Sequence, residues 1–168
     1  MNGSGSRLIL CVLLAFLLSL SLLGQQNAST DNFIGKWKLN VDKSKLPPER
    51  ETITIELQGS QCKISDDVAY DNGTELNFWT LTDMKGTVSK LTQSNGKPMN
   101  EEWRVTREDA NNFVIDSRPF RNVSRYTVGA DGHTLTKRPI SSELVVAKVN
   151  KNGTPEKVVQ ILVFDRRP

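Results

Sequence analysis

The chain has 168 residues, of which 37% are hydrophobic and 24% are charged, and its formal net charge is +3. This length fits one globular domain with a targeting segment, and so small a net charge points to no strongly charged partner. Basic and acidic residues alternate along the chain without a long block of one sign, so we expect no one-sided basic patch and predict no nucleic-acid binding.

The first predicted segment, residues 1–24, has the pattern of a secretory signal peptide. Arg7 is its only charge, and it precedes the apolar run LILCVLLAFLLSLSLL at 8–23. As a helix rising about 1.5 Å per residue, this run would reach roughly 24 Å, less than the hydrocarbon core of about 30 Å. We therefore predict a cleaved signal, a periplasmic or extracellular location and no stable membrane insertion after cleavage. A retained membrane anchor is the alternative.

A polar linker, QQNASTDN at 25–32, separates the signal from the predicted domain at 33–168. Cleavage directly after Gly24 and a later cut near Ala28 or Ser29 both fit the pattern. The linker is too poor in apolar residues to join a core, so the domain is expected to begin at residue 33.

The cysteine count excludes an internal disulfide in the exported chain. Cys11 lies in the leader and would be removed with it, which leaves Cys62 as the one thiol. A packed core must therefore stabilise the domain, and its length is sufficient for one. Cys62 is predicted to be a small buried hydrophobic residue on a strand, with an intermolecular disulfide as the alternative.

From residue 33 onward, apolar and polar residues alternate as in strands with one buried face. The stretch ETITIELQ at 51–58 alternates without interruption, and QCKIS at 61–65 continues the pattern with Cys62 and Ile64 inward. The run LNFWTLT at 76–82 is apolar on both faces, so either its Phe or its Trp must lie outside or beneath a loop. Other strands are expected at 36–41, 101–107, 111–116, 122–129, 133–138, 143–149 and 158–165.

Four Asx-Gly pairs separate these runs, and they predict tight hairpin turns of type I′. They are Asn72-Gly73, Asn95-Gly96, Asp131-Gly132 and Asn152-Gly153. The segment DANN at 109–112 is predicted to be a further tight turn, and Pro47-Pro48 excludes helix or ladder pairing in the loop at 42–51. No segment has a helical pattern. We predict an all-β antiparallel up-and-down meander of about 8–10 strands, closed into a barrel because closure removes exposed edges.

Several motifs resemble those of bacterial secreted lipocalin-like domain proteins. These are GKWKLNVDKSK at 35–45, ITIELQG at 53–59 and ADGHTLT at 130–136. The family opening is similar to GTWKLNVAKSK, and its later turn is similar to SKDGKTLT. The resemblance covers about residues 33–168. It implies a calycin-type barrel with a central cavity, although the usual lipocalin disulfide is absent.

The same resemblance implies a structural motif at one end of the barrel. The family's Gly-x-Trp triplet corresponds to Gly35, Lys36 and Trp37. In lipocalins this tryptophan closes the barrel beneath a cationic side chain from the last strand, for which Arg166 and Arg167 are the candidates. An arginine over an indole face would add roughly 0.5–2 kcal/mol, depending on burial.

The sequence contains no convincing catalytic or metal-binding constellation. His133 is the one histidine, and it is expected in an exposed turn, where neither a Ser-His-Asp nor a Cys-His arrangement can form. Adjacent acids such as Asp66-Asp67 point to opposite faces of a strand and cannot act together. One histidine and one cysteine cannot build a transition-metal cluster. We therefore predict a protein without enzymatic activity, catalytic residues, metal or cofactor.

Ligand capture remains as the leading hypothesis, because a small barrel either fills its interior with side chains or holds one small ligand. We predict an exported protein that binds a small hydrophobic or amphipathic molecule in the barrel. The alternative is a structural or interaction module with a filled core. The candidate ligand-binding residues are Trp37, Ile55, Leu57, Phe78, Trp103, Phe113 and Tyr126.

Overall fold

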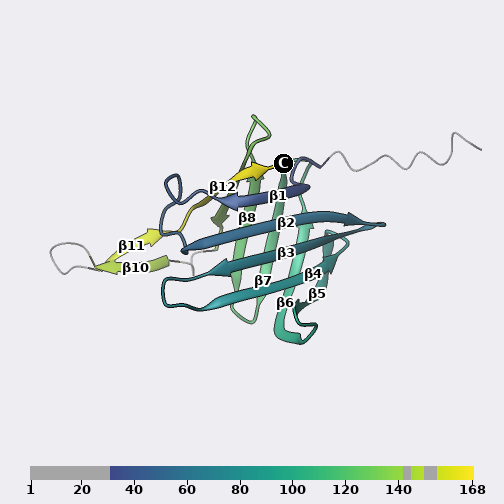
Figure 1. Ribbon diagram of the computed structural model, residues 1–168, viewed down its shortest axis with the longest axis horizontal. Helices are drawn as coiled ribbons and strands as arrows, with labels where there is room; N and C mark the ends of the chain where they lie inside the picture. Colours follow the sequence, from purple (N-terminus) through teal and green to yellow (C-terminus); the bar gives the residue numbers. More distant parts are fainter. Residues whose placement is uncertain (1–30, 142–144, 150–154) are drawn as a thin grey trace, which may run out of the picture. The chain divides into compact units, whose positions relative to one another are not determined.

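The computed structural model describes residues 31–141, 145–149 and 155–168. The predicted signal peptide at 1–24, nearly all of the linker and the Asn152-Gly153 turn lie outside these residues. The described part consists of twelve strands joined by turns and loops (Figure 1). The strands are β1 (Gly35–Leu39), β2 (Arg50–Gln58), β3 (Gln61–Ala69), β4 (Glu75–Thr82), β5 (Lys85–Gln93), β6 (Pro98–Arg107), β7 (Asn112–Arg118), β8 (Asn122–Val128), β9 (Thr134–Pro139), β10 (Val145–Val149), β11 (Pro155–Val159) and β12 (Leu162–Arg167).

Ten of these strands form a closed antiparallel barrel in the order β1-β12-β9-β8-β7-β6-β5-β4-β3-β2. The first strand closes it, because Trp37 pairs with Ile53 of β2 on one side and with Arg166 of β12 on the other. Every barrel strand thus has two neighbours, and no edge is left unpaired. The predicted all-β meander and its closure into a barrel are confirmed.

Two parts of the strand assignment differ from the prediction. Strand β5 was missed because register shifts between Lys85 and Val88 and between Lys90 and Thr92 interrupt its alternation, so its sequence lacks a clean period of two. The single strand expected at 158–165 is divided into β11 and β12. Strands β10 and β11 pair with each other in a separate two-stranded sheet rather than in the barrel.

The predicted hairpin turns occur at three described Asx-Gly pairs, but their type differs. Gly73, Gly96 and Gly132 have positive φ, whereas the residues before them do not belong to the positive-φ set, as a type I′ turn would require. In two of the turns, Asn72 and Asn95 accept hydrogen bonds from the backbone N–H two residues later. In all three turns the glycine N–H donates to the carbonyl three residues earlier, a pattern typical of a type I turn that ends in a glycine of positive φ.

The apolar core fills the interior toward the end of the barrel where Phe33 and Trp37 lie, both fully buried. Phe33 packs edge-on against Phe113 at 5.0 Å, and Phe113 stacks on Tyr126 at 4.6 Å between ring centroids. Cys62 and Ile64 are buried, as predicted. In LNFWTLT it is Trp79 that lies outside, where Lys63 Nζ sits 5.3 Å from its ring centroid.

Candidate ligand site in the barrel interior

The interior is polar toward the opposite end, where a cavity of about 170 Å³ lies among the strands. Strands β2 to β4 and β6 to β9 supply its walls, mostly through residues two apart, which share one face of a strand. Its polar groups are Glu51, Asp66, Glu101, Ser117, Asn122, Ser124 and Lys137. Its aromatic rings are Tyr70, Phe78, Trp103 and Tyr126. The cavity therefore offers charged groups and apolar surface together.

Lys137 and Glu51 form an ion pair in the wall, with 2.8 Å between Nζ and Oε1. The Glu51 side chain is only 2% exposed. Burial by itself would lower the pKa of Lys137, but the charges of Glu51, Tyr126 and Asp66 raise this pKa well above its usual value. The ammonium also lies 5.8 Å from the centroid of the Tyr126 ring. Lys137 thus remains charged and already has a carboxylate partner.

Asp66 is the unusual group in this cavity. It is 5% exposed, and its Oδ1 has no hydrogen-bond partner among the described residues. Burial, followed by the nearby charge of Glu51, raises the pKa of Asp66 to about 8. A buried acceptor without a partner costs about 1–3 kcal/mol. A buried acceptor without a partner in the wall of a cavity is a candidate for contact with a ligand.

Glu101 stands on β6 and is held by two donors. Its Oε1 accepts hydrogen bonds from Ser117 Oγ at 2.6 Å and from Trp103 Nε1 at 3.0 Å. Trp103 in turn packs edge-on against Phe78, with 5.4 Å between ring centroids. The two acceptor bonds fix the carboxyl and the indole as one rigid wall of the cavity.

The loop between β1 and β2 covers part of the polar end. Pro48 of this loop is buried and lines a second cavity of about 140 Å³, which shares Glu51 and Lys137 with the first. Lys45 pairs with Ile161, and Gln160 Nε2 donates to the Leu46 carbonyl at 2.6 Å. These contacts attach the loop around Pro48, called the strap below, to the residues that precede β12. The strap lies at the mouth of the cavity.

The other end is closed by Trp37 and Arg166. The Arg166 guanidinium lies 4.9 Å from the centroid of the Trp37 ring and donates to the carbonyls of Asn32, Ile34 and Gly132. Trp37 Nε1 donates to the Phe33 carbonyl at 2.8 Å. Gly35 has φ of 143°, and an added Cβ would lie 3.3 Å from the guanidinium. A glycine therefore suits the strand directly below this arginine.

The predicted ligand-binding residues divide into three groups. Phe78, Trp103 and Tyr126 line the cavity, whereas Trp37, Ile55 and Phe113 are fully buried in the apolar core. Leu57 is 45% exposed, so its predicted inward position is wrong. Its pairing with Cys62 is next to last in the β2–β3 hairpin. The alternation of apolar and polar residues in the sequence thus continues beyond the part of β2 that faces the packed interior.

Sequence reasoning missed the charged residues of the cavity. Glu51 has the same parity as Ile53 and Ile55, Asp66 the same as Cys62 and Ile64, and Lys137 the same as Leu135. A polar residue at an inward position of an alternating strand was therefore the available signal. Asp66 and Asp67 do point to opposite faces of β3, as their adjacency predicts, and only Asp67 is exposed.

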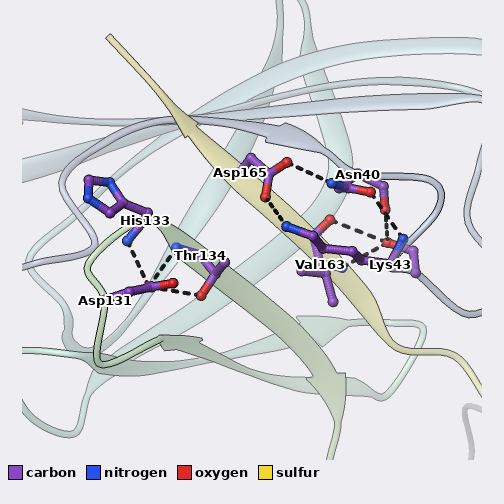
Figure 2. Close-up of polar contacts among 8 residues, drawn as sticks. Asn40, Lys43, Asp131, His133, Thr134, Val163 and Asp165 are labelled. Atoms are coloured by element: carbon purple, nitrogen blue, oxygen red, sulfur yellow. Dashed lines mark hydrogen bonds and ion pairs between the residues drawn. The ribbon is translucent and has the colours of Figure 1, made fainter.

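His133 lies in the turn between β8 and β9, outside the cavity (Figure 2). Its backbone N–H donates to Asp131 Oδ1 at 2.9 Å, and the same oxygen accepts from Thr134 N–H at 3.2 Å. Among the described residues, no group of three or more His, Cys, Asp and Glu side chains could hold a metal ion. Nor do these residues include a helix of the length and apolarity needed to cross a membrane.

The sequence matches no protein-family model and no curated protein. Among solved structures, the chain is similar to a Schistosoma mansoni fatty acid binding protein in complex with arachidonic acid, with a TM-score of 0.51 and 14% sequence identity. The similarity covers 84% of this chain and 100% of that one. At this level of identity it shows the fold alone. The domain is thus a closed ten-stranded antiparallel barrel with a fold similar to that of this fatty acid binding protein.

We predict that Asp66 makes the folded protein less stable as the pH rises from about 4 to about 8. In this pH range the Asp66 carboxyl of the folded protein, with a pKa of about 8, keeps its proton. The same carboxyl in the unfolded chain, with a pKa near 3.8, has released it. Stability falls wherever the folded state binds more protons. Asp66→Asn should therefore gain stability relative to wild type between pH 5 and pH 8 in urea unfolding. Asp67→Asn, at the exposed neighbouring position, should show no such gain. If the stability difference between Asp66→Asn and wild type is the same at pH 5 and pH 8, the assignment of the raised pKa to Asp66 is contradicted.

Proposed function

We propose that this protein binds a small amphipathic molecule in the polar half of its barrel. The observation that supports the proposal is the cavity of about 170 Å³, in which aromatic rings stand beside the buried Asp66 carboxyl, whose Oδ1 has no hydrogen-bond partner among the described residues. A structural core gains nothing from such a group, because an unsatisfied buried acceptor destabilises it. A ligand that donates a hydrogen bond to this carboxyl would remove the penalty.

The volume limits the ligand. Most small-molecule sites measure about 300–1,000 Å³, whereas a cavity of about 150 Å³ accommodates benzene. The present cavity fits a compound with one ring or a short chain. A long acyl chain would need the strap around Pro48 to move or the apolar core to repack. The similar fatty acid binding protein was solved in complex with arachidonic acid. The packed Trp37 half of the present barrel argues against a ligand of that length.

The alternative function, a module with a filled core, is favoured by one observation. Trp37, Phe33 and Phe113 are all fully buried in the apolar half. If the polar cavity holds only water, the barrel would act through its outer surface. The two functions differ in whether the interior exchanges water for an organic molecule.

Native mass spectrometry of the protein purified from its own host tests the proposal. We expect a co-purified molecule of low mass that dissociates on denaturation. A Trp103→Ala variant, which removes one wall of the cavity, should lose it, whereas Trp79→Ala on the outer face should keep it. Clean apo protein that also ignores a panel of one-ring compounds would contradict ligand binding.

We also propose that the protein is exported and that its leader is removed, as the pattern of residues 1–24 predicts. The intact mass from the same experiment measures this directly. Cleavage after Gly24 or near Ala28 gives two different masses, and the mass of the full 168-residue chain would contradict cleavage.

A further inference from the structure

The ionisable groups that face the cavity are mostly acidic. Three carboxyl groups line it, those of Glu51, Asp66 and Glu101, against the single ammonium of Lys137. They stand on four different strands, β2, β3, β6 and β9, so the excess belongs to the interior and is not a solvated acidic face of one strand. A ligand with a negative charge would add to this excess.

The one cation is not available to an anionic ligand. Lys137 Nζ is 2.8 Å from Glu51 Oε1, and the Glu51 side chain is 2% exposed. An anion that bound Lys137 would leave Glu51 as a buried charge without its partner, which is strongly unfavourable. A carboxylate ligand is therefore poorly suited to this barrel, although the fold is shared with a fatty acid binding protein.

Asp66 provides the second, independent observation. It is a carboxyl at 5% exposure with Oδ1 unpartnered, and it lines the same cavity. Glu101 by contrast already accepts two hydrogen bonds from Ser117 and Trp103. The cavity thus lacks hydrogen-bond donors for Asp66 Oδ1 and for Asn122 Oδ1, which also has no partner among the described residues. Only at Asp66 would a positively charged donor also offset the excess of carboxyl groups.

We infer that the cavity binds a small organic ammonium compound, whose N–H group donates to the Asp66 carboxylate. Ammonium–carboxylate hydrogen bonds are about twice as strong as neutral ones. The rings of Phe78, Trp103 and Tyr126 can contact the apolar part of the ligand and attract its cationic end. A bare metal ion does not fit, because no group of three or more ligating side chains exists among the described residues. This inference rests on the proposed function.

Binding of the cation should release a proton. In the empty cavity burial keeps Asp66 protonated, and the ammonium replaces that proton as the neutralising charge, so one proton leaves to the buffer. Affinity should therefore rise with pH until the amine itself begins to lose its charge. The other titratable groups that act on Asp66 are Glu51, Asp67, Glu101 and Lys137, with the phenols of Tyr70 and Tyr126 in the same wall.

Isothermal titration calorimetry with three probes of nearly equal shape tests the inference: benzylamine, benzyl alcohol and benzoate. We expect benzylamine to bind about ten- to hundredfold more tightly than the other two, the factor typical of one charge-assisted hydrogen bond in a buried site. Titration in two buffers with different ionisation enthalpies should reveal proton release for benzylamine alone.

Variants assign the effect to the carboxyl. Asp66→Asn should weaken benzylamine about tenfold or more and leave benzyl alcohol unchanged, and the exposed Asp67→Asn should alter neither. The melting curve of Asp66→Asn is compared with that of wild type to show that the variant is folded. Glu101→Gln removes a second carboxyl of the cavity, and we expect it to weaken benzylamine binding selectively. Equal or tighter binding of benzoate or benzyl alcohol would overturn the ammonium inference while ligand binding stands. Failure of all three probes would overturn both.

Discussion

Replacing Trp37 by alanine is expected to lower the free energy of unfolding by about 3–5 kcal/mol, the loss typical of a large aromatic side chain removed from a core. Trp37 is fully buried, lies under the Arg166 guanidinium and donates to the Phe33 carbonyl. Its removal opens a cavity and leaves that carbonyl and guanidinium without their shared partner. Chemical denaturation with fluorescence or circular dichroism measures the loss.

A second tryptophan provides the matched control. Trp79 also lies near a cation, Lys63, but on the outer face of β4. Trp79→Ala should lower the free energy of unfolding by about 1 kcal/mol or less, because an exposed cation–π contact contributes about that much. Trp37→Phe keeps most of the packing and should fall between the two. Equal losses for the two alanine variants would contradict the assignment of Trp37 as the residue that closes the barrel.

Replacing Lys137 by methionine is expected to be similarly severe, by about 3–5 kcal/mol, since it leaves a buried carboxylate without its partner. The ion pair joins β2 to β9 across the barrel interior, with side-chain exposures of 2% for Glu51 and 24% for Lys137. The double variant Glu51→Gln/Lys137→Met removes both charges and should regain much of the lost stability. A double-mutant cycle measured by urea unfolding gives the coupling energy.

The ion pair between Lys43 and Asp165 is the control for this cycle. It fastens the loop after β1 to β12 together with Asn40 (Figure 2), but its side chains are 55% and 34% exposed. Lys43→Met should lower the free energy of unfolding by less than about 1 kcal/mol, as is usual for exposed pairs. Strictly additive effects of the Glu51 and Lys137 substitutions would show that the buried pair contributes no coupling.

The two halves of the interior keep the stabilising core apart from the proposed binding site. The Trp37 half is closed by packing and by the hydrogen bonds of Arg166 to three carbonyls. The packing of that half offsets the destabilising effect of the unpartnered Asp66 oxygen in the polar half. The unpartnered oxygen and the tightly packed core lie at separate ends. The cavity can therefore stay open while the barrel stays closed.

The sequence by itself determined the class of fold. Alternation in segments such as ETITIELQ and the Asx-Gly pairs are local properties, and local properties are sufficient to specify antiparallel strands joined by short turns. The order of hairpins then leaves closure as the way to remove two edges. Alternation did not reveal β5, where bulges disturb the period of two. It also did not reveal that β10 and β11 pair with each other and not with a barrel strand.

The tertiary structure alone decided the site. Glu51, Asp66 and Lys137 are far apart in the sequence, and only the barrel register brings them to one cavity. Parity shows that they point inward, but not whether the interior at their level is filled, as it is around Trp37, or open. That depends on the volumes of side chains contributed by seven different strands. The alternating pattern therefore determined which residues face inward, and packing between distant strands decided which of them close the barrel and which surround the cavity.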